Sequence, residues 1–280
     1  MNPFEERKEK QERIDTVMSQ SKYMITVGSG ERGDGKSTVA ANLAIMLAKK
    51  GFKTCLADTD IYGPSIPTLF DIKNEDIMTI EQNGEQYILP VEKYGLKLMS
   101  IGFMVESSSP LIWRGPMASN TLTQMLSETY WEDLDFLVLD MPPGTGDIQL
   151  TLTQTFHPTG SIFVCTPGQL ADADVKRAIT MFQTEKLNIP VFGLVENMAY
   201  FTPKELPQNK YYIFGKSIGE ELSKELNIDF LGQIPIALSV SESNDSGNPI
   251  ALTEDSIVGK VFEELTDKVI AKSKETKNNK

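Results

Sequence analysis

"GSGERGDGKST", residues 28–38, is the stretch that decides the fold. Gly30, Gly35, Lys36 and Ser37 satisfy the pattern G-x-x-x-x-G-K-[ST] of a phosphate-binding loop. In such a loop the backbone N–H groups, the lysine and a magnesium ion hold the phosphates. This loop also carries two acids, and the direction in which their carboxylates point decides whether it can hold a polyanion.

The sequence on either side of the loop predicts a strand before it and a helix after it. Residues 23–28, "YMITVG", form a short apolar run that is typical of a buried strand. Residues 36–51 have apolar positions at helical spacing and end at a glycine. Residues 53–58, "KTCLAD", predict the next strand. This order opens a parallel βαβ unit, in which the loop's N–H groups and the positive helix end converge on one spot.

The same alternation continues along the chain. Further strands are predicted at 96–102, 136–140, 161–166, 190–197 and 229–235, and further helices from about 115 and at 171–187, 214–226 and 257–270. Residues 78–91 interrupt it, with Asn83-Gly84 joining two alternating runs as a hairpin. We therefore expect an α/β fold: a doubly wound, mostly parallel sheet flanked by helices, of P-loop NTPase type, with a small β-hairpin insertion.

Composition limits the classes of partner. The formal net charge is −12 and the pI is near 4.7, which argues against broad binding to nucleic acid or to anionic membranes. No apolar run is long enough to cross a bilayer, and the first residues do not resemble a signal peptide. Two isolated cysteines favour a reducing compartment. We expect a cytoplasmic protein with no nucleic-acid or membrane partner.

Three segments are expected. Residues 1–21 are charged and helix-compatible and predict a helical extension. Residues 22–272 carry the alternating pattern and predict a single P-loop domain. Residues 273–280 are polar and lysine-rich, so we expect a frayed C-terminal tail.

The loop residues have separate expected roles. Lys36 reaches the terminal phosphates, and the Ser37 hydroxyl ligates Mg²⁺. The side chains of Glu31, Arg32 and Asp34 are expected to point outward, toward solvent or a second subunit. The predicted nucleotide-binding residues of the loop are Gly33, Asp34, Gly35, Lys36, Ser37 and Thr38.

Acids at the ends of the predicted strands complete the site. Asp140 ends an apolar run, where a Walker B carboxylate holds Mg²⁺. Asp58 and Asp60 follow another strand, so that one carboxylate can lie near Mg²⁺ while the other orients an attacking water. Both could instead be loop or helix-cap acids. Asp60, Lys36 and Asp58 are the candidate catalytic residues. Asp147 is expected to cap the next helix.

Several segments together resemble the deviant-Walker P-loop ATPases, a superfamily that includes MinD, ParA and nitrogenase iron protein, and more closely the Mrp-type iron–sulfur cluster carriers. The matching blocks occur in that family's order: "DTDIYGPSIP" (58–67), "WRGPM" (113–117), "LDMPPGTGD" (139–147), "VENMAYF" (195–201), "YIFGKSIGEELSKEL" (212–226) and "DFLGQIP" (229–235). The resemblance covers about residues 22–251.

The resemblance implies a slowly hydrolysing ATPase that works as a homodimer with Mg²⁺, and iron–sulfur assembly or client proteins as partners. It implies an iron–sulfur cluster as cargo, Asn197 as the residue that reads the adenine edge, and Asp60 as a carboxylate near the hydrolytic water.

Two departures from the family pattern affect function. Glu31 replaces the lysine that reaches across the family's dimer to the partner's phosphates. Residues 201–212 lack the family's C-x-x-C pair, and Cys55 and Cys165 lie in predicted buried strands, so no cluster ligands are expected. A nucleotide-switched interaction module without a cluster is therefore the main alternative. The loop acids also resemble those of bacterial tyrosine kinases. That reading and a MinD/ParA-like positioning ATPase rank last, because the chain has neither a tyrosine-rich tail nor DNA-type basicity.

Overall fold

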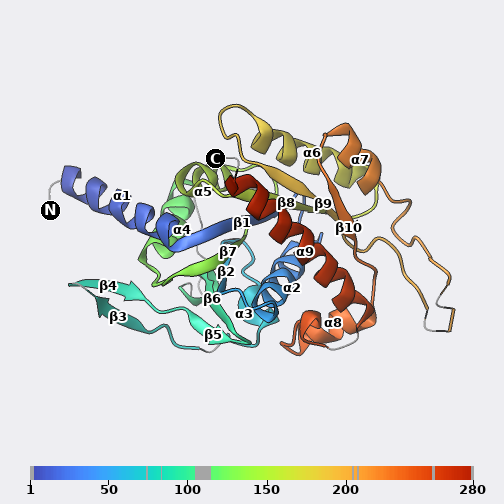
Figure 1. The fold of residues 1–280 in the computed structure, drawn as a ribbon, viewed down its shortest axis with the longest axis horizontal. Helices are drawn as coiled ribbons and strands as arrows, with labels where there is room; N and C mark the ends of the chain where they lie inside the picture. The colour runs from blue at the N-terminus through green and yellow to red at the C-terminus, as the bar shows by residue number, and fades with distance from the viewer. Residues whose placement is uncertain are drawn as a thin grey trace.

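The computed structural model describes residues 3–73, 75–82, 84–104, 115–203, 205–206, 208–253 and 256–278. Their centre is an eight-stranded sheet with the order β10-β9-β8-β1-β7-β2-β6-β5 (Figure 1). Its strands are β1 (Ser21–Ser29), β2 (Thr54–Asp58), β5 (Val91–Lys93), β6 (Leu96–Ser100), β7 (Leu134–Asp140), β8 (Gly160–Cys165), β9 (Val191–Glu196) and β10 (Phe230–Gln233). Neighbouring strands are parallel except for β5, which pairs antiparallel with β6.

Helices cover both faces of this sheet. They are α1 (Pro3–Gln20), α2 (Lys36–Lys49), α3 (Ile66–Leu69), α4 (Gly115–Glu128), α5 (Asp147–Phe156), α6 (Gln169–Gln183), α7 (Gly219–Glu225), α8 (Leu238–Asp245) and α9 (Ile257–Asn278), with 3-10 turns at Ile101–Phe103 and Ile250–Leu252. A separate hairpin, β3 (Thr79–Gln82) with β4 (Glu85–Ile88), is antiparallel. The predicted doubly wound, mostly parallel sheet with a hairpin insertion is confirmed.

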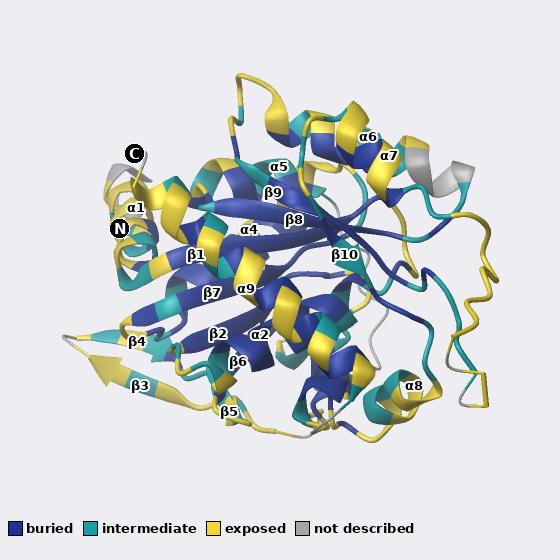
Figure 2. Cartoon of the chain, turned by 45° about the vertical axis from the view of Figure 1, so that its right-hand side comes forward, coloured by how far each residue is buried: buried dark blue, intermediate teal, exposed yellow. Residues whose placement is uncertain are grey.

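Side-chain alternation in the central strands builds two of the cores. In β1, Tyr23, Ile25 and Val27 pack with α2 and α9, whereas Met24 packs on the opposite face with α1, α4 and α5. A third cluster lies between β8, β9 and the helices α6 and α7. Figure 2 shows the central strands β1, β2, β7, β8 and β9 as a buried layer, and helices such as α6 and α9 with exposed residues on one side. Parallel strands covered on both faces are expected to be apolar throughout, and these are.

The C-terminal end differs from the prediction. The expected frayed tail over 273–280 is wrong at least to Asn278, because α9 runs on to that residue. Ser273 is fully buried and its hydroxyl donates to the carbonyl of Val269, and Lys277 lies over the ring of Tyr23. The last turns therefore dock on the start of β1.

Two further differences have local causes. The helix predicted from 214 begins only at Gly219, because the backbone N–H groups of Ile218 and Gly219 donate to the carboxylate of Glu196 and fix the start there. Gly215 has φ +104°, outside the helical range. The strand β5 and the helix α8 are not foreseen by periodicity, because both are short and partly exposed. Within the described ranges no helix is long and apolar enough to cross a membrane.

The strand order positions the site. Because carboxyl ends of parallel strands share one edge, the loops after β1, β2, β7, β8 and β9 meet there. β1 lies between β7 and β8, so the loop at 30–35 lies between Asp140 and Thr166.

Candidate functional site

The glycine-rich loop and the start of α2 form a site suited to an anion. Gly33 and Gly35 have φ of +93° and +80°, which lets the chain turn sharply into the helix. The N-cap of α2 is Gly35, no side chain caps the first turn, and no acid lies in it. The free N–H groups and the positive helix end therefore face a pocket of about 330 Å³.

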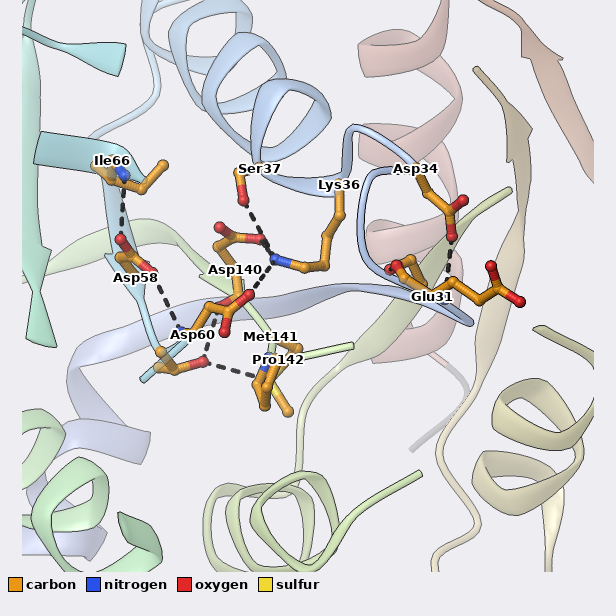
Figure 3. A network of polar contacts seen from close by, with 12 residues as sticks. Glu31, Asp34, Lys36, Ser37, Asp58, Asp60, Ile66, Asp140, Met141 and Pro142 are labelled. Atoms are coloured by element: carbon orange, nitrogen blue, oxygen red, sulfur yellow. Dashed lines mark hydrogen bonds and ion pairs between the residues drawn. The ribbon is translucent and has the colours of Figure 1, made fainter. Parts of the chain in front are cut away.

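Lys36 is buried, lines this pocket and lies in the middle of a network of polar contacts (Figure 3). Its Nζ donates to Asp140 Oδ1 at 2.6 Å and to Ser37 Oγ at 3.2 Å, and lies 3.6 Å from Asp60 Oδ2. Burial alone would lower the pKa of Lys36, but the nearby carboxylates of Asp140 and Asp60 outweigh it, and the pKa is raised. The ammonium group is thus held charged in a cluster of oxygen atoms.

Two carboxylate oxygens of this cluster lack partners. Asp140 Oδ2 and Asp60 Oδ1 are buried and accept no hydrogen bond from the described residues. Burial, and less strongly the charge of Asp140, raises the pKa of Asp60 even though Lys36 and Arg32 oppose this. Buried oxygens without donors are costly, so these atoms are suited to a ligand that supplies positive charge or a proton.

Asp58 lies beside the cluster but has a different geometry. Its Oδ1 accepts from the N–H of Asp60 at 3.1 Å, and its Oδ2 accepts from the N–H of Ile66 at 3.1 Å and the hydroxyl of Ser100 at 3.0 Å. Asp58 does not line the pocket. Burial and the neighbouring charge of Asp140 raise the pKa of Asp58 to about 7. Its contacts fix the 59–66 loop and hence Asp60.

The two loop acids point in different directions. Glu31 is exposed, as expected, and so is Arg32. The expectation that Asp34 points outward is wrong, because its side chain is only 5% exposed and turns back into the loop. Its Oδ2 accepts from the N–H of Glu31 at 3.1 Å, and Thr166 Oγ1 donates to its Oδ1 at 3.3 Å. Sequence reasoning missed Thr166, for which only its position after a strand is a signal.

Asn197 joins the site from the end of β9. Its Nδ2 donates to the carbonyl of Asp34 at 2.8 Å, and its backbone N–H donates to the carbonyl of Cys165. A Cβ on Gly35 would collide with the Asn197 amide, so glycine is required there. The predicted adenine-reading residue therefore also touches the phosphate loop.

The segment after β7 packs against the phosphate loop. The N–H of Gly144 donates to the carbonyl of Ser29 at 2.9 Å. The expected cap by Asp147 is not seen, because Gly146 is the N-cap of α5 and Asp147 is its first residue, where its charge still suits the helix end. Gln149, which sequence reasoning did not single out, donates to the carbonyl of Pro142. Of the block "WRGPM", Trp113 and Arg114 lie outside the described residues.

The site offers oxygen atoms of the kind that magnesium prefers. Ser37 Oγ and the unpartnered Oδ2 of Asp140 are hard oxygen donors of the kind that Mg²⁺ prefers. Cys55 and Cys165 are fully buried in β2 and β8, and burial raises the pKa of Cys55 well above its usual range. Among the described residues no group of three or more His, Cys, Asp or Glu could hold a metal ion.

Comparison with known proteins agrees with this geometry. The iron-sulfur cluster carrier protein of Aquifex aeolicus is 51% identical over 261 residues, which cover 92% of this chain and 70% of that protein. A nucleotide-binding protein from Archaeoglobus fulgidus, solved in complex with ADP, has a TM-score of 0.75 and 35% identity, covering 88% of this chain and 94% of that one. The cell division ATPase MinD of Pyrococcus furiosus shares the fold, with a TM-score of 0.62 and 15% identity over 89% of this chain and 98% of that one.

A family model of P-loop NTPases matches most of the chain. Residues 20–270 match the family described as "ParA: NUBPL iron-transfer P-loop NTPase". The match spans the glycine-rich loop, both acid-bearing strands and Asn197. The chain belongs to this family of iron-transfer P-loop NTPases.

Proposed function

We propose that the chain binds ATP with Mg²⁺ and hydrolyses it slowly, and that it works as a homodimer in iron–sulfur cluster transfer. The observation that carries the nucleotide part is the buried Lys36 ammonium, which lies between Asp140, Asp60 and Ser37 at the start of an uncapped helix. Phosphate oxygens compete for the same ammonium and for the same helix N–H groups. The ADP complex of the Archaeoglobus fulgidus protein supports this assignment.

The proposed division of roles follows the contacts. Lys36 neutralises the terminal phosphates, and Ser37 and Asp140 hold Mg²⁺. When bound, the ion neutralises charge that develops on the phosphate oxygens. Asp60, with an unpartnered oxygen and a raised pKa, orients the attacking water. Asp58 acts as a positioning residue, since it holds the backbone of Asp60.

Recognition of the base is assigned to Asn197. Its Nδ2 is already bonded to the carbonyl of Asp34. The amide Oδ1 is then the atom that would accept a hydrogen bond from the amino group of adenine, which guanine lacks at that position. In a calorimetric titration we expect Asn197→Ala to weaken the binding of ATP more than that of GTP, because both nucleotides lose the contact that holds the phosphate loop and only ATP loses the contact to its base.

The rate of ATP hydrolysis by the wild type and by Asp60→Ala tests the proposed hydrolase activity. We expect phosphate release by the wild type that depends on Mg²⁺, and a loss of roughly a hundredfold or more in Asp60→Ala, because the water loses its orienting group. Asp76→Ala, which removes an exposed acid in a loop, is the matched control. Equal background rates in wild type and Asp60→Ala would remove the hydrolase assignment.

The homodimer proposal is supported by exposed apolar side chains in the segments that follow the parallel strands. Most of the large apolar side chains that are exposed in the described chain lie in loops or helix starts that follow parallel strands: Tyr62, Met104, Met117, Leu206, Tyr211, Tyr212, Ile213, Phe214 and Leu238. They therefore share the edge of the sheet that carries the nucleotide pocket. Exposed apolar side chains that gather on one side of a protein are typical of protein interfaces.

Sedimentation analysis with and without ATP tests this surface. We expect the wild type to dimerise with ATP and Tyr212→Ser/Ile213→Ser to remain monomeric. Met78→Ser, which alters an exposed apolar residue beside the hairpin, should behave as the wild type. A dimer that survives the double substitution would place the interface elsewhere.

The burial of both cysteines favours a second function, a nucleotide-switched interaction module that carries no cluster of its own. Both cysteines are buried in strands, and residues 197–219 contain none. Cluster ligands are thiolates, and a bridging cluster needs accessible ones from each subunit. Anaerobic reconstitution with iron and sulfide, read by absorbance, separates the two. Substoichiometric iron supports the module, and a stable stoichiometric cluster supports a carrier.

A further inference from the structure

Asp34 is a buried acid in the phosphate loop for which the proposed hydrolysis has no use. Both oxygens of its carboxylate have donors, the N–H of Glu31 and the hydroxyl of Thr166. Its carbonyl accepts from the Asn197 amide. This one residue therefore ties the loop to itself and to the segments that follow β8 and β9.

These contacts bear on the shape of the loop. Gly33 and Gly35, on either side of Asp34, have left-handed backbones, and glycine has the largest conformational freedom to lose on ordering. The bond from the N–H of Glu31 to the Asp34 carboxylate closes the turn between them. A carboxylate that accepts backbone N–H groups forms a charge-assisted bond, which is stronger than a neutral one. Asp34 thus fixes the loop in the bend that presents its N–H groups.

The charge of Asp34 has a second consequence. Asp34 is one of the residues that line the pocket, while its carboxylate turns back toward the N–H of Glu31 within the same loop. Burial raises its pKa, against the hydrogen bonds from Glu31 and Thr166 that lower it. Additional negative charge in the same pocket favours the protonated carboxyl further.

Among the described residues no cation is paired with Asp34. On its own loop, Glu31 is negative and adds to the rise in the pKa of Asp34. The guanidinium of Arg32, also on this loop, lies beside Gly63 and acts on Asp60. Thr166 and Asn197, from the ends of β8 and β9, are uncharged. From α2, Lys36 is bonded to Asp140. From α6, which packs against the loop at Gly30, Asp174 is paired with Arg177.

We propose that Asp34 is a positioning residue for nucleotide binding and that its carboxyl takes up a proton from solvent when the phosphates of the nucleotide enter the pocket. The inference rests on the proposed nucleotide function. Bound nucleotide then favours the protonated form, so affinity falls as pH rises. The loop acid makes nucleotide binding sensitive to pH while keeping the loop ordered.

Calorimetric titration with MgADP tests whether the Asp34 carboxyl takes up a proton when the nucleotide binds. Wild type and Asp34→Asn are titrated at about pH 6, 7 and 8, each in two buffers of different ionisation enthalpy, so that the protons exchanged are counted. We expect the wild type to take up a fraction of a proton and Asp34→Asn to take up none. Asparagine keeps an acceptor for the N–H of Glu31, so its affinity should match or exceed that of the wild type at the highest pH.

Two further variants test positioning. Asp34→Ala removes the acceptor as well as the charge, and should bind MgADP roughly tenfold more weakly than Asp34→Asn. Thr166→Val loses one hydrogen bond but keeps the carboxylate, so proton uptake should persist. Thermal unfolding followed by circular dichroism checks that each variant is folded.

The outcomes separate the claims. Unchanged proton uptake in Asp34→Asn would overturn the charge role, and equal affinities of Asp34→Ala and Asp34→Asn would overturn the positioning role. A folded wild type that binds no MgADP would refute the proposed function itself, and the role of Asp34 with it.

Discussion

Two groups of carboxylates lie at the pocket or directly behind it, and they differ in the hydrogen-bond donors that their oxygens have. The acids after β2 and β7, Asp60 and Asp140, face the ammonium of Lys36 and keep one buried oxygen each without a donor. The acid inside the loop, Asp34, has N–H and O–H donors on both oxygens. The first group is arranged to exchange partners with a ligand, whereas the second holds the loop in shape.

The largest effect is expected from removing the cation of the first group. Lys36→Met should lose MgATP binding by roughly a hundredfold or more, because the phosphates lose their main cation while Asp140 and Asp60 keep their charges. Lys50→Met, at the other end of α2 and paired with Asp267, is the control. Calorimetric titration with MgATP compares the affinities of these two variants with that of the wild type. If Lys36→Met binds within a few-fold of the wild type, the first group has no role in phosphate binding.

Asp140→Asn should change the affinity for ATP differently in the presence and in the absence of Mg²⁺. With Mg²⁺ we expect ATP binding to weaken roughly tenfold, since the ion loses a charged oxygen ligand. With the metal chelated, binding should not weaken, because Lys36 loses its partner at 2.6 Å and becomes freer to contact phosphate. Titrations with excess Mg²⁺ and with a chelator measure both. Equal weakening in both conditions would argue that Asp140 only supports the structure.

Asp58→Asn probes an acid that belongs to neither group. The pKa of Asp58 is raised to about 7 in the folded chain, so between about pH 4 and 7 the folded state holds a proton that the unfolded state has released. Stability of the wild type should therefore fall as pH rises through this window. Asparagine removes that contribution, and the slope should flatten.

Urea unfolding at a series of pH values measures this slope. It should be reduced rather than abolished, because burial raises the pKa of Asp60 and Asp34 as well. Asp76→Asn, an exposed acid, should leave the slope unchanged. A slope that is identical in Asp58→Asn and the wild type would mean that Asp58 is ionised throughout the window.

Sequence patterns predict the fold well here because the central strands are apolar on both faces and end in polar residues. Lys36, Ser37 and Asp140 could be placed together from the strand and helix order alone. The orientation of the Asp34 side chain could not be predicted from the sequence. Between two glycines, a polar side chain can point to solvent or back into the loop, and the donors that decide this come from other parts of the fold. Thr166 lies 132 positions away in the chain, so that contact exists only after the sheet has formed. The start of α7 depends likewise on Glu196 from another element.

The smallest effect is expected at Glu31, which contrasts with Asp34 three positions later. Within the described residues the Glu31 carboxylate has no hydrogen bond or ion pair, and the side chain is exposed, so solvent screens its charge. Glu31→Gln should change MgADP affinity by less than about threefold and leave proton uptake in place. Calorimetric titration of Glu31→Gln and Asp34→Ala with MgADP, under the same conditions, compares the two effects on affinity. An effect of Glu31→Gln as large as that of Asp34→Ala would mean that charge near the pocket, and not the bonds of the buried carboxylate, governs the loop.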